Sequence, residues 1–283
     1  MEFYEKNSVS FYLSQLTPIC EFDSAKQKVG LYRHPLLGRV LILNGEIQHI
    51  ENYQYLYHES LVHVSAAFIK SPKNCLILGG GSLFAAFEVL KYPSIERVVL
   101  CDFDHAVIDL MIKNYEHAQQ VKKDKRFNFI EEDAKVFIKD LNEEYDLIIS
   151  DCFDLAEMNN GFSMYDRLFR LCSEQGVCSD VIYRHIFDKD CLTNSLGQLK
   201  SQANLALSLV IIPEYPGVLH LQIIWGKNRN VHQNQKHTFN EFQHNLANLE
   251  KFKMFTPNNL PYYLYLPPYL KKFVLQETFC KAF

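Results

Sequence analysis

The first fifty residues carry short apolar runs separated by turn signals. Apolar-rich runs cover residues 27–33 and 39–43, and Asn44-Gly45 follows the second run directly. An Asn-Gly pair in this position is a strong signal for a two-residue hairpin turn, after which residues 46–49 form the return strand. The pattern predicts a small N-terminal antiparallel β-hairpin domain over residues 1–50.

The spacing of apolar residues changes to a helical period between residues 51 and 70. Apolar or aromatic side chains recur there at Tyr53, Leu56, Tyr57, Leu61, Val64 and Phe68. Ser71-Pro72-Lys73 then ends the predicted helix.

From residue 74 onward, short apolar runs alternate with amphipathic stretches. Strands are predicted over residues 75–78, 97–101, 127–130, 145–150, 177–182, 207–212 and 219–225, and helices near 83–91, 105–116, 134–141, 164–174, 189–204 and 238–250. Such alternation predicts an α/β fold with a doubly wound, mostly parallel sheet. The last two strands follow each other after a short Pro-Gly turn and are expected to pair antiparallel. The Pro- and Tyr-rich residues 257–268 are expected to pack along the surface.

Composition narrows the class of protein. Of the 283 residues, 48% are hydrophobic and 22% are charged, and the formal net charge is −4, as in an ordinary globular protein. No basic stripe indicates a nucleic-acid partner, and no run of 18 apolar residues indicates a membrane span. The eight cysteines form no CxxC pair and the amino terminus has no long apolar core. We therefore expect a cytoplasmic protein with scattered thiols and no signal peptide.

A glycine-rich loop and an acidic residue follow the first two strands of the predicted sheet. Gly79-Gly80-Gly81-Ser82 comes directly after the first strand, and glycines there let the backbone turn sharply and approach a ligand closely. Asp102 ends the second strand, about 20 residues after the glycines, where a carboxylate can accept from both hydroxyls of a ribose. Asp104 is the better candidate for a helix cap. The full GxGxxG pattern is absent because position 84 is Phe.

Carboxylates also follow the third and fourth strands. Asp133 follows the third strand. In sheets that bind an adenosyl group this strand end meets the adenine, and Asp133 also fits a cap for the next helix. Asp151 and Asp154 lie three residues apart at the end of the fourth strand, where two buried carboxylates are costly unless a cationic ligand meets them. The eleven histidines form no HxH or HExxH pattern, so no metal site is expected.

The order of these motifs resembles the spermidine synthase family, the polyamine aminopropyltransferases, over residues 22 to 273. In sequence order they are similar to the family's Ser-x-x-Gln, LDGxIQ, YHE, glycine-loop, DxxDP and PTYPxG motifs. The matching segments are Ser24-x-x-Gln27, Leu43-Asn44-Gly45-Glu46-Ile47-Gln48, Tyr57-His58-Glu59, Gly79-Gly80-Gly81, Asp151-x-x-Asp154 and Pro213-Glu214-Tyr215-Pro216-Gly217. The resemblance implies a Rossmann-like catalytic domain over residues 51–283 of the class I S-adenosylmethionine-dependent type.

The resemblance also implies an activity and a homodimer. In the family, an aminopropyl group moves from decarboxylated S-adenosylmethionine, the co-substrate, to an amine such as putrescine, which gives spermidine and methylthioadenosine. Asp151 is the implied general base. The implied nucleoside and thioether site consists of Gln27, Gln48, Gly79, Gly80, Gly81, Ser82, Asp102 and Asp133. The implied amine site consists of Tyr57, His58, Asp154 and Tyr215.

The sequence departs from the family at three places, which keeps alternatives open. The family's glycine loop continues with an aspartate that resembles an anchor for the aminopropyl amine, whereas this chain has Ser82. Leu155 replaces the proline of DxxDP, and residues 156–163 are shorter than the family's gate loop. Because Ser82 removes a charge that would repel the carboxylate of intact S-adenosylmethionine, a methyltransferase or 3-amino-3-carboxypropyl transferase is the second hypothesis. A third, a binding protein without turnover, does not explain why both Asp151 and Asp154 are present.

Overall fold

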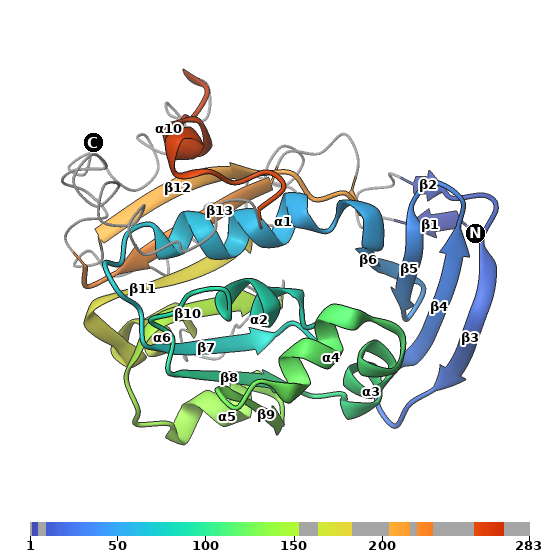
Figure 1. Ribbon diagram of the computed structural model, residues 1–283, viewed down its shortest axis with the longest axis horizontal. Helices are drawn as coiled ribbons and strands as arrows, with labels where there is room; N and C mark the ends of the chain where they lie inside the picture. Colours follow the sequence, from blue (N-terminus) through green and yellow to red (C-terminus); the bar gives the residue numbers. More distant parts are fainter. Residues whose placement is uncertain are drawn as a thin grey trace.

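The computed structural model describes residues 2–4, 10–152, 164–182, 204–215, 220–228 and 252–268. Two sheets organise this part of the chain, with four strands in one and seven in the other. Figure 1 shows the smaller sheet at one end of the molecule, beside the helices that cover the larger sheet.

The N-terminal sheet is antiparallel, as the sequence predicts. Its strands pair in the order β3 (Thr17–Asp23), β4 (Lys28–His34), β5 (Gly38–Leu43) and β6 (Glu46–Ile50). Asn44 and Gly45 both have positive φ, 51° and 86°, which confirms the predicted two-residue turn. Two short strands, β1 (Glu2–Tyr4) and β2 (Ser10–Tyr12), pair separately.

A helical segment links the two sheets. It consists of η1 (Glu51–Tyr53), α1 (Tyr55–Glu59) and the π-helical turn η2 (Ser60–Val64). A π-turn inserted into a helix often marks a functional region. Here it follows Tyr57, whose side chain reaches the candidate site described below.

The larger sheet has the order β12-β13-β11-β10-β7-β8-β9. Its strands are β7 (Asn74–Gly79), β8 (Arg97–Asp102), β9 (Phe127–Glu131), β10 (Tyr145–Asp151), β11 (Cys172–Ile182), β12 (Asn204–Val210) and β13 (His220–Gly226). β13 is antiparallel to both neighbours, and the other described pairs are parallel. The predicted antiparallel pair of β12 and β13 is therefore confirmed.

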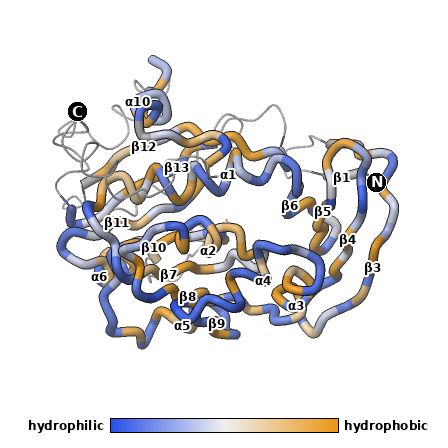
Figure 2. Tube along the Cα trace, viewed as in Figure 1, coloured by the Kyte–Doolittle hydropathy of each residue, from blue (hydrophilic) through white to orange (hydrophobic). Residues whose placement is uncertain are grey.

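Both faces of the sheet are covered because alternate strand residues are apolar on both sides. Ile77, Leu100 and Ile149 belong to one core cluster, whereas Leu76 and Ile148 belong to the other. The first cluster includes residues of α2 (Phe84–Val89), α3 (His105–Asn114) and α4 (Glu116–Lys123), and the second includes residues of α5 (Ala134–Asp140) and α6 (Met164–Leu171). Figure 2 shows the hydrophobic colour along β7 and a mostly hydrophilic α4.

Several predicted boundaries differ from the structure. The helix predicted near 105–116 is α3, which ends at Asn114, and a second helix that the sequence did not predict, α4, begins at Glu116 after extended backbone at Tyr115. The helix predicted to reach residue 174 ends at Leu171, and β11 begins at Cys172. In the Pro- and Tyr-rich segment, η5 (Pro257–Asn259) leads into α10 (Leu260–Tyr263), whose Leu260 and Tyr263 are buried. The helices predicted near 189–204 and 238–250 lie outside the described residues, apart from the start of β12.

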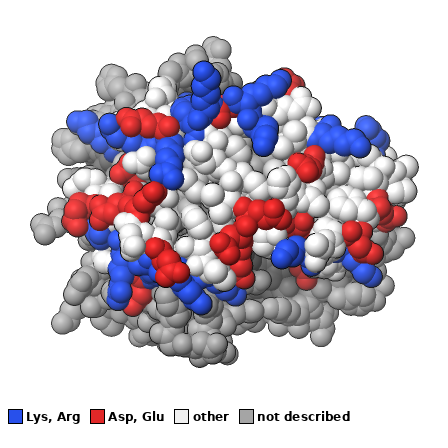
Figure 3. All heavy atoms as spheres, turned by 90° about the horizontal axis from the view of Figure 1, so that it is seen from below, with Lys and Arg blue, Asp and Glu red and all other residues white. Residues whose placement is uncertain are grey.

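None of the described helices has the length and apolar character needed to span a membrane. On the face drawn in Figure 3, basic and acidic side chains are interspersed among the described residues.

Candidate active site

The glycine loop lies against the carboxyl end of β10. Gly79 and Gly80 have φ values of +76° and +82°, a conformation that L side chains rarely adopt. A Cβ atom on Gly80 would lie 3.0 Å from Oδ2 of Asp151, and one on Gly79 would lie 2.9 Å from Cβ of Cys152. Glycine is therefore required at both positions for the loop to approach Asp151 so closely.

Asp151 is a partly buried residue whose carboxyl group has one phenolic partner. The hydroxyl of Tyr57 on α1 donates to Oδ1 of Asp151 at 2.7 Å. The pKa of Asp151 is raised to about 7, mainly by burial and also by the charges of Asp102 and Asp180, while the Tyr57 hydrogen bond lowers it. Such a carboxyl can gain and lose a proton near neutral pH, as a general base must.

Asp102 ends β8 beside the glycine loop. A Cβ atom on Gly81 would lie 3.1 Å from Oδ2 of Asp102, and Oδ1 accepts from the backbone N–H of Asp104 at 3.0 Å. Burial raises the pKa of Asp102, and the backbone donors oppose that rise. Its position at the strand end, next to the glycines, is the one from which a carboxylate can bind a ribose diol.

Gln27 connects the N-terminal sheet to the loop after β8. Its amide nitrogen donates to Oδ2 of Asp104 at 2.8 Å, and the hydroxyl of Ser24 donates to the same oxygen at 2.7 Å. Oδ1 of Asp104 accepts from the backbone N–H of Ala106, which confirms Asp104 as the cap of α3. Gln27 thus lies beside the loop that carries Asp102, with its amide nitrogen bonded to Asp104.

Asp133 and Gln48, two residues predicted for the nucleoside and thioether site, both have exposed side chains. Oδ1 of Asp133 accepts from the backbone N–H of Lys135 at 2.7 Å, which confirms the predicted cap of α5. The Asp133 side chain is exposed beyond the end of β9. Gln48 is exposed on β6.

Three predicted amine-site residues have different environments. His58 is buried with its ring 5.2 Å from that of Phe84, and its Nδ1 lies 2.9 Å from the carbonyl oxygen of Gln54. Burial lowers the pKa of His58 to about 4 despite that carbonyl. Tyr215 is buried in the turn after β12. Asp154 lies outside the described residues.

The loop around Ser82 is held by its neighbours. Nε2 of His117 lies 2.9 Å from the carbonyl oxygen of Ser82, and the His117 ring stacks on Phe84 at 3.5 Å. Leu83, which is fully buried, has a φ of +64°. Positive φ at a bulky residue is strained, and it persists where surrounding packing fixes it.

Two further carboxyl groups lie at this edge of the sheet, and the sequence reasoning missed both. Asp180 is on β11 and accepts from the hydroxyl of Tyr165 at 2.6 Å. Glu214 follows β12 and accepts from the backbone N–H of Ile50 at 2.8 Å. Burial raises the pKa of Asp180 to about 6 and that of Glu214 to about 7. A charged residue at the end of an apolar strand was the available signal for Asp180, and Glu214 was visible in the PTYPxG-like segment.

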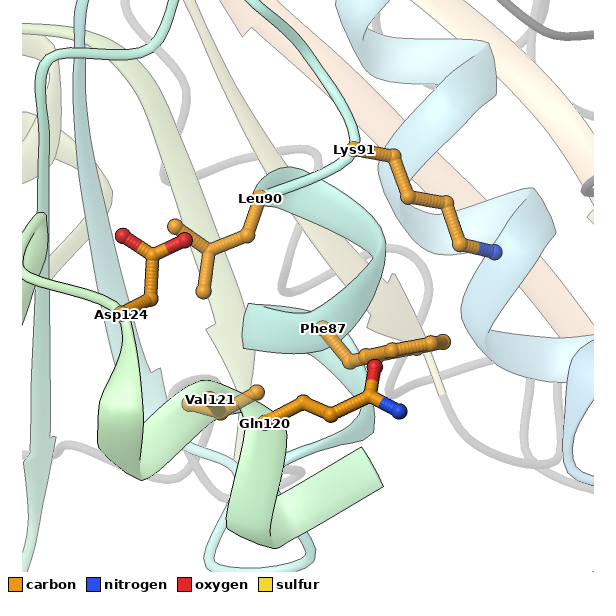
Figure 4. Close-up of a pocket in the computed structure, with 6 residues that line it drawn as sticks. All are labelled: Phe87, Leu90, Lys91, Gln120, Val121 and Asp124. Atoms are coloured by element: carbon orange, nitrogen blue, oxygen red, sulfur yellow. The ribbon is translucent and has the colours of Figure 1, made fainter. Parts of the chain in front are cut away.

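A separate cavity of about 420 Å³ lies away from these strand ends. Figure 4 shows it between α2 and α4, with Phe87 and Leu90 on one side and Gln120 and Val121 on the other. It has no part in the candidate site. No cluster of potential metal ligands occurs within the described ranges.

The family model for the spermine/spermidine synthase domain matches residues 54–236, which is more than half of the chain. The chain is 37% identical to a polyamine aminopropyltransferase of Saccharolobus solfataricus over 153 residues, which cover 53% of this chain and 51% of that protein. It is 31% identical to polyamine aminopropyltransferase 1 of Aquifex aeolicus over 201 residues, covering 69% and 71% of the two chains. It is 33% identical to putrescine N-methyltransferase 2 of Nicotiana attenuata over 199 residues, covering 67% and 53%. The aligned part thus spans about half the length of two of these three relatives.

Solved structures share the fold. A crystal structure of spermidine synthase from Thermotoga maritima matches with a TM-score of 0.82 at 22% identity, over 96% of this chain and 92% of that one. A spermidine synthase in complex with the transition state analogue AdoDATO matches with a TM-score of 0.83, also at 22% identity and with the same coverage. The matched family domain carries the glycine loop and the acidic strand ends. The chain therefore belongs to the spermine/spermidine synthase family.

Proposed function

We propose that the chain is a polyamine aminopropyltransferase of the spermidine synthase type. It transfers the aminopropyl group of decarboxylated S-adenosylmethionine to a diamine such as putrescine, and methylthioadenosine leaves. The observation that carries this proposal is Asp151, a partly buried carboxyl with a raised pKa that is bonded to Tyr57 and that the glycine loop approaches closely. Homology to polyamine aminopropyltransferases supports it.

The raised pKa of Asp151 suits the proton transfer. An attacking amine must lose a proton because an ammonium group has no lone pair, and a free alkylammonium has a pKa of about 10. The pKa of Asp151 rises from 3.8 to about 7. That rise narrows the gap between the pKa of the ammonium group and the pKa of Asp151 by about 3 units, or about 4 kcal/mol.

The donor is proposed to lie over the glycine loop. Asp102 would accept from the ribose hydroxyls. Gly80 lies against Asp151 and Gly81 against Asp102, and because neither glycine has a side chain, the loop backbone can also face the ligand closely. Gln27 would contact the nucleoside beside Asp102, and its hydrogen bond to Asp104 would hold it there. Asp133 would meet the adenine, and Gln48 would lie near the thioether.

Ser82 supports a second candidate, transfer of a methyl or 3-amino-3-carboxypropyl group from intact S-adenosylmethionine. The hydroxyl of Ser82 carries no charge, so it neither attracts the donor's ammonium nor repels its carboxylate. The 33% identity to a putrescine N-methyltransferase agrees with this candidate. The two proposals share the amine and the nucleoside, and they differ in the group transferred.

Mass spectrometry of products separates the two candidates. The protein is incubated with putrescine and with an equal mixture of intact and decarboxylated S-adenosylmethionine. We expect spermidine and methylthioadenosine. N-methylputrescine with S-adenosylhomocysteine would establish the methyltransferase and overturn aminopropyl transfer. Ser82→Asp serves as the matched variant, because it should shift any mixed activity toward the decarboxylated donor.

We further propose a cytoplasmic homodimer with an N-terminal β-hairpin domain over residues 1–50 and a catalytic domain over residues 51–283. The homodimer follows from family membership, with the N-terminal β region contributing to the contact. Light scattering at micromolar concentration tests it, and a monomer at that concentration would contradict it.

A further inference from the structure

Glu214 is a buried carboxyl group that faces the same edge of the sheet as Asp151. It lies in the turn after β12 and is 7% exposed. β12 and β11 are both antiparallel to β13, so they run in the same direction, and β11 is parallel to β10. The carboxyl ends of β10 and β12 therefore open on one side of the sheet, which places Glu214 and Asp151 at that side.

The charges of the two groups act on each other and on Tyr57. The charge of Asp151 raises the pKa of Glu214, although burial is the larger cause. The charges of Asp151 and Glu214 also contribute to the raised pKa of Tyr57, again after burial. Tyr57, which donates to Asp151, thus lies within electrostatic reach of Glu214 as well.

The residues that the structure describes supply little to offset a negative charge on Glu214. The backbone N–H of Ile50 donates to Oε1, and the residue's own backbone N–H also lowers the carboxyl pKa, yet burial outweighs both. Within the described ranges, neither Glu214 nor Asp151 has a lysine or arginine among the groups that shift its pKa. Two buried carboxylates near each other are costly unless positive charge arrives from a ligand.

We propose that Glu214 binds the second ammonium group of the acceptor amine while Asp151 holds the amine that reacts. This inference rests on the proposed function and deepens it, since it requires an acceptor with at least two amines. The PTYPxG pattern has threonine at this position, so the negative charge is a feature of this chain. Glu214 also bonds to the end of β6, so the same side chain ties the N-terminal sheet to the amine site.

The test compares two amines of equal length, 1,4-diaminobutane and 1-aminobutane. Their affinities are measured by isothermal titration calorimetry on the full chain saturated with methylthioadenosine, so the result does not depend on turnover. We expect the wild type to bind the diamine more than tenfold more tightly. Glu214→Gln keeps an acceptor for the Ile50 N–H but removes the charge, and it should weaken the diamine about ten- to a hundredfold. The affinity for 1-aminobutane should change by a much smaller factor, because only the field of Glu214 reaches the amine held by Asp151.

Asp180→Asn is the matched control for a general loss of negative charge. Asp180 is equally buried and its charge also acts on Asp151, but its carboxyl is held by Tyr165 and by the N–H of Val181. We expect this variant to change the affinities of both amines by the same factor. If Glu214→Gln changed the affinities of both amines by the same factor, Glu214 would act only through its long-range charge, and the inference would be overturned.

The wild type alone also decides the question if Glu214→Gln does not fold. Equal affinity of the wild type for the two amines would overturn the inference, and transfer to 1-aminobutane would then leave the proposed function standing. Conversely, diamine binding that depends on Glu214 without any aminopropyl transfer would support the inference and refute the proposed function.

Discussion

Replacing Tyr57 with phenylalanine removes one hydrogen bond from the candidate base and leaves the aromatic ring. The Tyr57 hydroxyl donates to Asp151 at 2.7 Å, and this bond stabilises the carboxylate. It lowers the pKa of Asp151 against the burial that raises it to about 7. Without the donor, the carboxylate loses that stabilisation, and the pKa of Asp151 should rise.

The size of the rise follows from the strength of the bond. A hydrogen bond to a charged group contributes roughly 1.5–3 kcal/mol, which corresponds to about 1–2 pKa units and moves the pKa to about 8–9. At pH 7 the wild-type carboxyl is about half ionised, since its pKa is about 7. The variant would then be only about 1–10% ionised. We therefore expect kcat/KM at neutral pH to fall by about 5- to 50-fold and to recover at high pH.

The assay is kcat/KM for the amine from about pH 5 to about pH 10, which reports ionisations of the free enzyme. The wild-type acid limb should have its midpoint near 7, and the Tyr57→Phe limb about 1–2 units higher. Tyr165→Phe is the matched control, because the Tyr165 hydroxyl donates to Asp180 at 2.6 Å and not to Asp151. Coincident midpoints in wild type and Tyr57→Phe would refute the assignment of Asp151 as the base.

Three other predictions follow from single contacts. Methylthioadenosine at about 100 times its Kd should stabilise the wild type by about 2.7 kcal/mol, and Asp102→Ala should lose most of that melting shift; an equal shift would remove Asp102 from the nucleoside site. The folded pKa of Asp180 rises from 3.8 to about 6, so stability from this group is lost as pH rises through that window. In urea unfolding, the free energy of unfolding of Asp180→Asn should therefore rise relative to that of the wild type by up to about 3 kcal/mol from acid to neutral pH. A difference in unfolding free energy that does not change with pH would contradict the raised pKa of Asp180. Glu59 accepts the backbone N–H groups of Lys253, Met254 and Phe255 at 2.8 Å, so Glu59→Gln should lower the free energy of unfolding by about 2 kcal/mol or more; unchanged urea unfolding would show that these bonds add no net stability.

The strands were predictable because their signals are local. Asn44-Gly45 specifies its turn through two residues with positive φ, and β7, β8 and β10 are apolar on both faces because helices cover both sides of the sheet. The break between α3 and α4 was not predictable, since no glycine or proline marks Tyr115. The backbone of Tyr115 is extended, and its side chain makes tertiary contacts. One of them is with Arg39, whose guanidinium carbon lies 3.9 Å from the centre of the Tyr115 ring.

The candidate site was predictable only in part, for a related reason. Residues at strand ends, such as Asp102 and Asp151, follow from the rule that ligands bind at the carboxyl edge of a parallel sheet. The Tyr57–Asp151 bond joins residues 94 positions apart, so no local pattern shows it. Glu214 depends on the end of β6 for its partner, and Asp180 depends on α6. These roles emerge only once the two sheets and their helices are assembled.

The most direct test of the central claim is the single-turnover rate of Asp151→Asn with decarboxylated S-adenosylmethionine and putrescine both bound. Asparagine keeps the shape and can still accept from Tyr57, but it cannot take a proton. We predict that the rate of transfer falls by about 10²-fold or more, within the range for loss of a general base, while methylthioadenosine still binds as in the wild type. A rate within a few fold of the wild type would contradict the account and would mean that proximity alone drives the transfer.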